Sequence, residues 1–370
     1  MARAQKYCVL LFASALLISL AQPAQAETLR AASNLEASYF DHDLATRMAA
    51  LETELEMLHC GQTEVTAGKA WDVCSCYRPG LILAADVLFI RPRRAGLDFA
   101  ISDPNTDNNV EGPVESLELD SGIGVRGAIG YRTTSGWDAI FTYTHLDTDT
   151  ERTVVEPENG FLWLTRTAPA SYNNQADLAH AVADLNYDVF DLEAGYTVWP
   201  AASLPIRLFG GFRAAAIEQN FGVRYVGGTI SGERIQQQST QVDGYGLRGG
   251  AETQWLLGGG WSVFGRAAGS VLVGQFSILH TEDESGYAGQ GNVDVTYRYH
   301  DVLPMLDAAA GVSWQSGRLT WQAGYELTAV LNLDQPVNFT GAETVSRGQM
   351  VNVGNDLVLE GLFARLICDF

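Results

Sequence analysis

The 370-residue sequence lacks the features of helical membrane proteins and of nucleic-acid-binding proteins. Beyond the first 26 residues, no stretch approaches the roughly 18 consecutive apolar residues of a spanning helix. Lysine and arginine number 23 against 44 aspartates and glutamates, and the net charge of -21 argues against the basic face that nucleic acid requires. We therefore expect no spanning helix and no nucleic-acid partner.

Catalytic and metal-binding motifs are also missing. The chain has no Gly-x-Ser-x-Gly, no His-Glu-x-x-His, no phosphate loop and no dinucleotide-binding glycine motif, and its six histidines are scattered. Asp103, Asn105 and Asp107 begin like a calcium loop, but Asn108 and Val114 stand where that loop needs glycine and glutamate. We expect no enzymatic activity, no cofactor and no metal.

Residues 1–26 have the form of a signal peptide. Arg3 and Lys6 precede an apolar run of about 14 residues, which is followed by an Ala-x-Ala cleavage site at residues 24–26. The run is too short to span a membrane as a helix. We expect the mature protein to begin near Glu27 and to lie outside the cytoplasm.

Residues 27–79 form a separate segment with a short helical pattern. Apolar residues recur at spacings of four and three, as in a coiled-coil seam: Leu44, Met48, Leu51, Leu55 and Leu58. The pattern predicts a periplasmic helix of heptad type. This helix either joins copies of the chain in a homo-oligomer or packs on its own chain or serves as a spacer.

Cysteine is scarce, with five residues in the chain, of which four remain after the signal peptide is removed. Cys60, Cys74 and Cys76 follow the helical pattern, and Cys368 lies near the C-terminus. In an oxidising compartment we expect a disulfide from Cys60 to Cys74 or Cys76. A zinc site at the Cys-x-Cys pair is less favoured, because no second cysteine pair or His-x-x-x-His accompanies it.

Residues 80–370 change to a hydropathy period of two. In residues 119–131 the odd positions are mostly apolar, and the even positions are mostly Asp, Gly, Arg or Ala. Similar stretches begin at residues 81, 137, 190, 206, 245, 261, 302, 319 and 356. Each is long enough for a tilted membrane strand of roughly 9–11 residues. We predict an all-β fold, a transmembrane antiparallel up-and-down β-barrel of about 10 (10–12) strands.

The connections between these stretches alternate in length. Short breaks at residues 132–136, 200–205, 258–260 and 315–318 alternate with long polar segments at 92–117, 149–184, 219–240, 276–300 and 334–354. Outer-membrane barrels have short periplasmic turns and long external loops in this order. The alternation, together with an even number of strands, therefore predicts that both termini of the chain lie on the periplasmic side.

Tryptophan and the final residue agree with this orientation. Six tryptophans beside short breaks predict an aromatic girdle at the periplasmic boundary: Trp137, Trp199, Trp255, Trp261, Trp314 and Trp321. Trp199 is out of phase with the others and predicts a bulge before Pro200. The last strand stops at Phe370, which we interpret as the signal for the barrel-assembly machinery.

The order of these motifs resembles the family of Legionella-type pore-forming outer-membrane proteins. The resemblance rests on the helical pattern and on short motifs that follow in order at residues 80–89, 190–196, 208–213, 244–250, 262–266 and 361–365. It implies a porin-like passive channel in the outer membrane of a Gram-negative-type bacterium and brings no catalytic residues. Membrane lipid, lipopolysaccharide and the assembly machinery are the expected partners.

Charged side chains on the polar face of the strands are the candidate pore-lining residues. On the lipid face an arginine near mid-membrane would cost about 2–4 kcal/mol, so we place these residues in the lumen. They are Arg126, Asp191, Glu193, Arg207, Arg213, Arg248, Glu252, Arg266, Asp307, Glu326 and Arg365. They either line an ion path or pair across a narrow lumen and fill it. Positive and negative residues nearly balance, so this set predicts no ion preference.

We expect a porin-like channel for passive diffusion of ions and small hydrophilic solutes. One alternative is a closed barrel that anchors or adheres through its external loops. A barrel enzyme acting on lipid or peptide is less favoured, because no catalytic motif is present. Conductance separates the channel from the closed barrel.

Overall fold

The computed structural model describes residues 79–107, 109–166, 175–230, 232–285, 293–333 and 356–370. The predicted signal peptide, the helical pattern of residues 44–58 and the cysteines at 60, 74 and 76 lie outside these ranges. Within the described ranges, no helix has both the length and the apolar character needed to cross a membrane.

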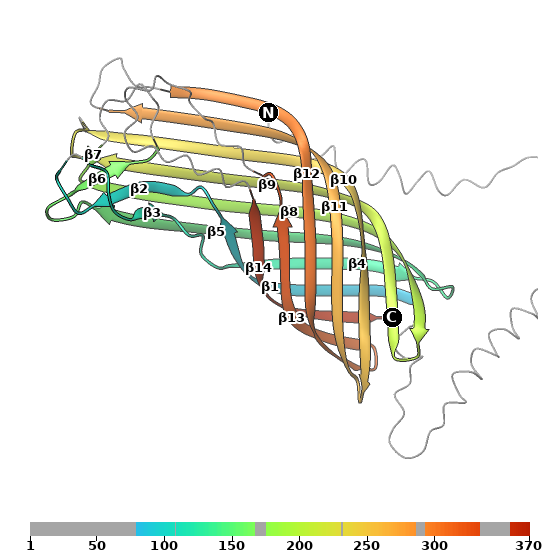
Figure 1. Cartoon of the computed structure of the whole chain (residues 1–370). Helices are drawn as coiled ribbons and strands as arrows, with labels where there is room; N and C mark the ends of the chain where they lie inside the picture. The colour runs from blue at the N-terminus through green and yellow to red at the C-terminus, as the bar shows by residue number, and fades with distance from the viewer. Residues whose placement is uncertain (1–78, 108, 167–174, 231, 286–292, 334–355) are drawn as a thin grey trace, which may run out of the picture. The chain divides into compact units, whose positions relative to one another are not determined.

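Ten antiparallel strands form a closed barrel (Figure 1). The strand β1 pairs with β4 on one side and with β14 on the other, so that Asp86 lies opposite both Arg126 and Arg365. The predicted all-β fold with about ten antiparallel strands is confirmed. The barrel strands are β1 (Gly80–Arg94), β4 (Gly122–Arg132), β5 (Trp137–Val155), β8 (Leu178–Ala201), β9 (Leu204–Val226), β10 (Glu233–Gly258), β11 (Trp261–Glu284), β12 (Val293–Ser316), β13 (Leu319–Val330) and β14 (Leu357–Asp369).

The short breaks predicted from the sequence are tight turns. Residues 133–136, 202–203, 259–260 and 317–318 join consecutive strands at one end of the barrel, which we call the short-turn end. The pairing of β8 with β9 shifts register between Val198 and Ala201, which confirms the bulge predicted before Pro200. All six tryptophans of the predicted girdle are exposed, and Trp314 lies opposite both Trp261 and Trp321.

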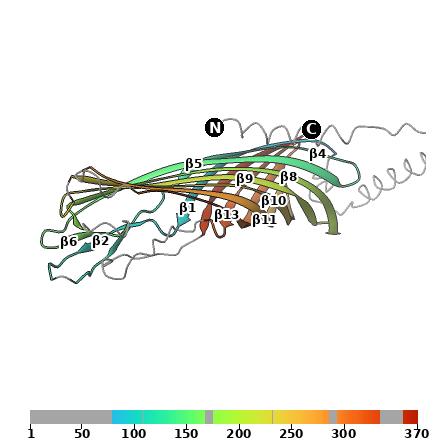
Figure 2. The same cartoon turned by 90° about the horizontal axis from the view of Figure 1, so that it is seen from above.

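At the other end, the long-strand end, several strands continue far past their neighbours. The five strands β8 to β12 have 23 to 26 residues, whereas β4 has 11 and β13 has 12. Figures 1 and 2 show these long strands running on together beyond the short ones. We call this part the extension: residues 147–155, 178–188, 217–226, 233–243, 275–284 and 293–303.

The prediction of long loops is therefore wrong for most of the described residues in 149–184, 219–240 and 276–300. The strands continue, but their apolar face changes sides. In β9, Leu208 and Phe212 face outward and are exposed, whereas Phe221 and Tyr225 of the extension face inward and are buried. The outward face of the extension is polar, as at Glu218. A prediction that requires apolar residues on the outward face of each strand therefore assigns this stretch to a loop.

A small sheet covers the inward face of the extension. Its strand order is β3 (Val114–Ser116), β2 (Asp98–Asp103), β6 (Phe161–Leu164) and β7 (Gln175–Ala176). The hydroxyl of Tyr225 donates a hydrogen bond to the carbonyl oxygen of Phe99 over 2.6 Å. The Arg166 guanidinium lies 5.3 Å from the ring centre of Phe221. Figure 2 shows β2 and β6 beside the long strands.

Candidate functional site

The barrel lumen collects the charged side chains that the sequence places on the polar faces of the strands. All eleven predicted residues face inward, and nine of them line a common cavity. Two further inward carboxylates, Asp86 on β1 and Asp138 on β5, form ion pairs with these residues but were not predicted from the sequence. The period-two alternation could have found both, because each occupies an inward position in its strand.

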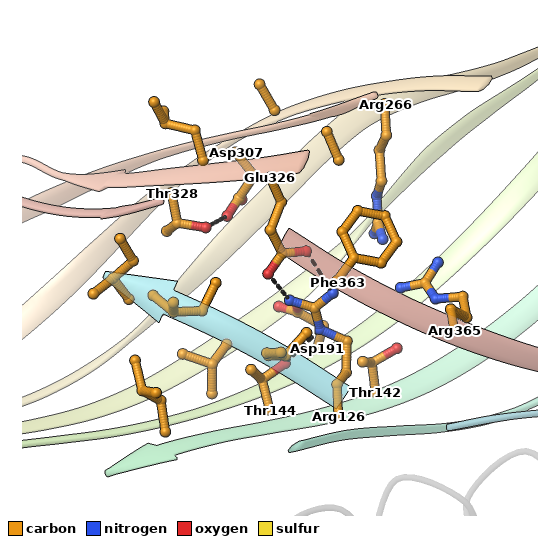
Figure 3. A pocket seen from close by; sticks show the side chains of 18 of the residues that line it. Arg126, Thr142, Thr144, Asp191, Arg266, Asp307, Glu326, Thr328, Phe363 and Arg365 are labelled. Atoms are coloured by element: carbon orange, nitrogen blue, oxygen red, sulfur yellow. Dashed lines mark hydrogen bonds and ion pairs between the residues drawn. The ribbon is translucent and has the colours of Figure 1, made fainter. Parts of the chain in front are cut away.

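Four of these residues form a first ion-pair network, the Arg126 network: Asp86, Arg126, Glu326 and Arg365. Arg126 donates two hydrogen bonds to the Glu326 carboxylate, of 2.7 and 2.9 Å, across the lumen from β4 to β13 (Figure 3). Its guanidinium also reaches Asp86 at 3.2 Å. Arg365 lies on β14, the other neighbour of β1, and donates hydrogen bonds to the Asp86 carboxylate, the shortest of them 2.8 Å. Guanidinium and carboxylate match in this forked geometry, and such pairs are strong when water is excluded.

A second ion-pair network, the Glu193 network, spans β5 and β8 to β12. Its centre is the buried Glu193 carboxylate, which accepts hydrogen bonds from three guanidiniums. Arg207 lies at 3.2 Å, Arg248 at 3.0 Å and Arg266 at 2.7 Å. Arg207 is also held by Asp138, at 2.7 Å. The ring of Phe209 packs against the same three guanidiniums, with Arg207 4.9 Å from its centre.

The other half of the Glu193 network ties β12 to the opposite strands. Arg213 binds both oxygens of Asp191, at 2.7 and 2.8 Å, and reaches Asp307 at 2.8 Å. Asp307 also accepts a hydrogen bond from Arg248 and one of 2.9 Å from the Thr328 hydroxyl. The full network is Asp138, Asp191, Glu193, Arg207, Arg213, Arg248, Arg266 and Asp307.

A cavity of about 70 Å³ lies between the two networks. Arg126, Glu326 and Arg365 line it from the first network, and Asp191, Arg266 and Asp307 are among those that line it from the second (Figure 3). A space of this size holds a few water molecules or a small ion.

Glu252 also lines the cavity but belongs to neither network. It lies opposite Arg207 and Arg266 in the register of β10 with β9 and β11. Those two guanidiniums bind Asp138 and Glu193 instead. Among the residues that the structure describes, Glu252 forms no hydrogen bond, but its charge attracts those of Arg207 and Arg266.

Toward the long-strand end, an apolar layer follows the charged residues. Nine of the ten barrel strands contribute a buried apolar side chain, each at most 5% exposed: Leu88, Leu146, Val189, Ile217, Val242, Leu272, Met305, Val330 and Leu359. The tenth strand contributes Gly124, and a Cβ built there would lie 3.4 Å from side-chain atoms of both Leu88 and Leu146. The layer fills the lumen on the long-strand side of the cavity.

Three other sequence hypotheses concern residues outside the lumen. Asp103 is buried, and its carboxylate accepts hydrogen bonds of 3.0 Å from the Asn105 amide and the Trp163 indole. The Asp103 carboxylate thus holds the turn at Asn105 and binds Trp163 of β6. Cys368 forms no disulfide within the described part of the chain. The Phe370 ring is exposed, and its amide donates a hydrogen bond of 2.9 Å to the carbonyl oxygen of Leu81.

Comparison with known structures finds other barrels of the outer membrane. The outer membrane protease OmpT from Escherichia coli is 10% identical, with 79% of this chain and 97% of that chain covered and a TM-score of 0.42. The outer membrane protein AlkL is 11% identical, over 84% of this chain and 97% of its own, with a TM-score of 0.27. A Pseudomonas aeruginosa FadL homologue is 8% identical, over 80% and 92%, with a TM-score of 0.23. Similarity at this level carries no argument about activity.

Sequence comparison is more specific. No curated protein matches the chain. The family model described as the Legionella pneumophila major outer membrane protein precursor matches residues 73–370, which include every described strand. The chain therefore belongs to the Legionella major outer membrane protein family and is a β-barrel protein of the Gram-negative outer membrane.

Proposed function

We propose that the protein is an outer-membrane channel for ions and small hydrophilic solutes, and that its lumen is shut in the conformation described here. The observation that carries the proposal is the charged cavity between the Arg126 network and the Glu193 network. A lumen that only had to be filled could be apolar throughout, whereas charges at membrane depth are costly and usually mark an ion path. The cavity would form the polar central section of such an ion path.

The apolar layer supports the closed state. Side chains such as Leu272 and Met305 are fully buried there, and a constriction of this kind excludes water and therefore ions. By the usual arrangement of outer-membrane barrels, the long-strand end faces the outside of the cell. Passage then requires the apolar layer to move apart, and ions then pass through the cavity between the two ion-pair networks, whose pairs cross the lumen.

The same layer favours a second candidate function, a permanently closed barrel that acts through the extension. The extension is an ordered structure with its own core, in which Tyr225 and Phe99 are fully buried. An ordered external surface suits adhesion or anchoring. We include no catalytic activity in either proposal.

Three further proposals concern assembly and partners. Phe370 is exposed at the end of β14 and is available to the barrel-assembly machinery. Lipid and lipopolysaccharide would surround the outward apolar residues such as Leu208 and Phe212. A homo-oligomer through the segment of residues 27–79 remains a proposal from the sequence alone.

Recording from purified, folded protein in planar lipid bilayers tests the channel. We expect discrete current steps separated by long silent intervals, because the apolar layer must move before ions pass. Folding is checked by the change in electrophoretic mobility that heating causes in intact barrels. Folded protein that gives no steps at any voltage or salt concentration contradicts the channel and leaves the closed barrel as the function.

A further inference from the structure

The extension has an open edge along β12. Strand β13 begins to pair with β12 only at Met305, so no described strand lies beside residues 293–303 on that side (Figure 1). On their other side these residues pair with β11 without a bulge, and they include no proline and no lysine. Natural edge strands are usually protected by such features, and a long edge without them pairs readily with another strand.

The opposite edge of the extension, along β5, is covered by the chain itself. The Thr148 hydroxyl donates a hydrogen bond of 3.0 Å to the carbonyl oxygen of Asp120, and the Arg152 guanidinium donates one of 2.8 Å to that of Ser116. The segment that contains these acceptors therefore runs beside β5. Of the two edges that the structure describes, the β12 edge is the one open to a new strand.

Backbone geometry identifies the groups at the open edge. The carbonyl oxygen of Pro304 accepts a hydrogen bond of 2.9 Å from the amide of Leu331, which follows β13, so the backbone of Pro304 is directed to that side. In a regular strand every second residue is directed to the same side. The Val302 amide is bound to the Asp301 carboxylate over 2.7 Å, which ends the open stretch. The residues with backbone groups directed to the open edge are Asp294, Thr296, Arg298 and His300.

The charges along this edge are complementary to themselves about Thr296. Asp294 and Arg298 are exposed on the outward face, and neither forms an ion pair with a described residue. If two β12 edges pair antiparallel about Thr296, each Asp294 lies opposite the other Arg298, and each Val295 lies opposite the other Tyr297. Pairs of opposite charges, and of β-branched with aromatic residues, stabilise neighbouring strands. A shift of the axis by one residue loses both ion pairs, and a shift by two sets like charges opposite each other.

We propose that the β12 edge of the extension binds the same edge of a second copy of this chain, antiparallel about Thr296. The two Thr296 residues exchange amide-to-carbonyl hydrogen bonds, so backbone and side chains favour one isologous contact. The two-fold axis of such a pair is perpendicular to the sheet. Because the extension continues the barrel wall, this axis lies along the membrane plane. The two copies therefore face each other from two membranes, and their pairing joins one cell surface to another.

The contact is small, since it includes only residues 293–299 of each copy, and a single pair is weak. Where each surface carries many copies, the contacts act together and the total affinity rises without any new interaction. This inference deepens the second candidate function, adhesion through the extension. It does not depend on whether the barrel conducts.

Tethering of vesicles tests the pairing. The protein is reconstituted in surface-bound and in fluorescent phosphatidylcholine vesicles, and retained fluorescence is compared at equal numbers of outward-facing extensions. Wild-type vesicles should bind each other. Asp294→Arg should lower retention by about tenfold, because two attractive pairs become repulsive, and Arg298→Asp should have the same effect. Asp283→Arg changes an exposed carboxylate on the outward face of β11 and should retain wild-type tethering.

Mixing the variants tests the register. Asp294→Arg vesicles combined with Arg298→Asp vesicles again have opposite charges at both contacts, so tethering should return to the wild-type level. Asp283→Arg vesicles combined with Arg298→Asp vesicles have the same difference in net charge but keep one repulsive pair at the edge. They should tether less than the first mixture, which separates the specific contact from general attraction.

Three outcomes overturn the proposal. They are folded wild-type protein that tethers no vesicles, single variants that tether like the wild type, and a mixture of Asp294→Arg with Arg298→Asp that stays apart. Folding is checked by the change in electrophoretic mobility on heating. Protein that tethers vesicles but gives no current steps contradicts the channel and retains the edge contact. Protein that conducts without tethering does the reverse.

Discussion

Gly80 lies where the first strand meets the last residue of the chain. Its φ angle is 147°, and a Cβ atom built there would lie 1.8 Å from the carbonyl oxygen of Phe370. Any other residue must push the end of the chain away from β1, whose pairing with β14 closes the barrel. Glycine is therefore required at this position by both backbone conformation and space.

Gly80→Ala should consequently reduce the yield of assembled barrel. The fraction that migrates as folded protein in an unheated gel measures the effect. Gly127→Ala is the matched control, because a Cβ at Gly127 meets no atom within 4 Å. Equal folded fractions for the two variants would contradict a steric role of Gly80 in closing the barrel.

Glu193 is the residue on which the larger ion-pair network depends. It is 3% exposed and holds three guanidiniums. In Glu193→Gln those arginines lose their shared charge partner while they remain buried, and breaking a buried pair costs about 3–5 kcal/mol. The free energy of unfolding in urea, measured in lipid vesicles, should fall by an amount of this order. Glu218→Gln, an exposed carboxylate on the outward face, should change it little.

At the scale of elements, the extension depends on the reversal of the apolar face within continuous strands. Inside the membrane the outward side chains meet lipid, so they are apolar. Beyond it the outward side chains meet water, and the inward ones, such as Val223 and Tyr225, pack on the small sheet. The buried surface of the extension also includes polar groups, among them His280 on the inward face of β11.

His280 should make the extension sensitive to acid. Burial, and secondarily the positive charge of Arg166, lowers the pKa of His280 below its ordinary 6.5. The unfolded chain therefore binds a proton at His280 more readily than the folded extension does. The contribution of neutral His280 to the stability of the extension is fully present above about pH 6.5 and declines as the pH falls. The decline should not exceed about 1.4 kcal/mol per pH unit.

Hydrogen exchange of the amides in β10 and β11, compared between about pH 8 and pH 5 after correction for intrinsic rates, measures this decline. The slope should flatten in His280→Gln, which stays neutral throughout. His300→Gln changes an exposed histidine on the neighbouring strand and should retain the slope. Acid sensitivity that is the same in both variants would rule out His280 as its source.

At the scale of the whole molecule, the apolar layer decides whether ions pass. Leu272 and Met305 lie on the neighbouring strands β11 and β12, and both are fully buried inside the lumen. Replacing both with alanine removes side-chain volume from the layer and should increase the frequency of current steps in planar bilayers. The double variant should also be less stable, by about 2–5 kcal/mol for each truncation.

Leu306→Ala is the control for this variant, since Leu306 is an exposed side chain on the outward face of β12. It should leave the current unchanged. Silent wild-type protein together with a conducting double variant would show that the apolar layer is the barrier. Silence in both, with folding intact, favours the closed barrel that acts through the extension.

The sequence by itself determined the strands within the membrane, their turns and the inward position of the charged residues. These features are local, because the pleat alternates side chains along each strand and the turns need only a few adjacent residues. The bulge near Trp199 was within reach for the same reason. Most of the extension was predicted as loop rather than strand. Its apolar residues face inward, opposite to those of the membrane part, and pack on a small sheet formed by distant segments.

Only the tertiary structure decided which charges meet. Arg126 and Glu326 are 200 residues apart, and Asp86 and Arg365 are 279 apart. Their contacts depend on the tilt of the strands and on the closure of β1 against β14 and β4, which bring inward residues of distant strands to one level. That closure separates two neutral networks and leaves Glu252 beside the cavity. The sum of charges along the sequence contains no trace of this division, because side-chain pairing across a lumen is a property of the closed barrel.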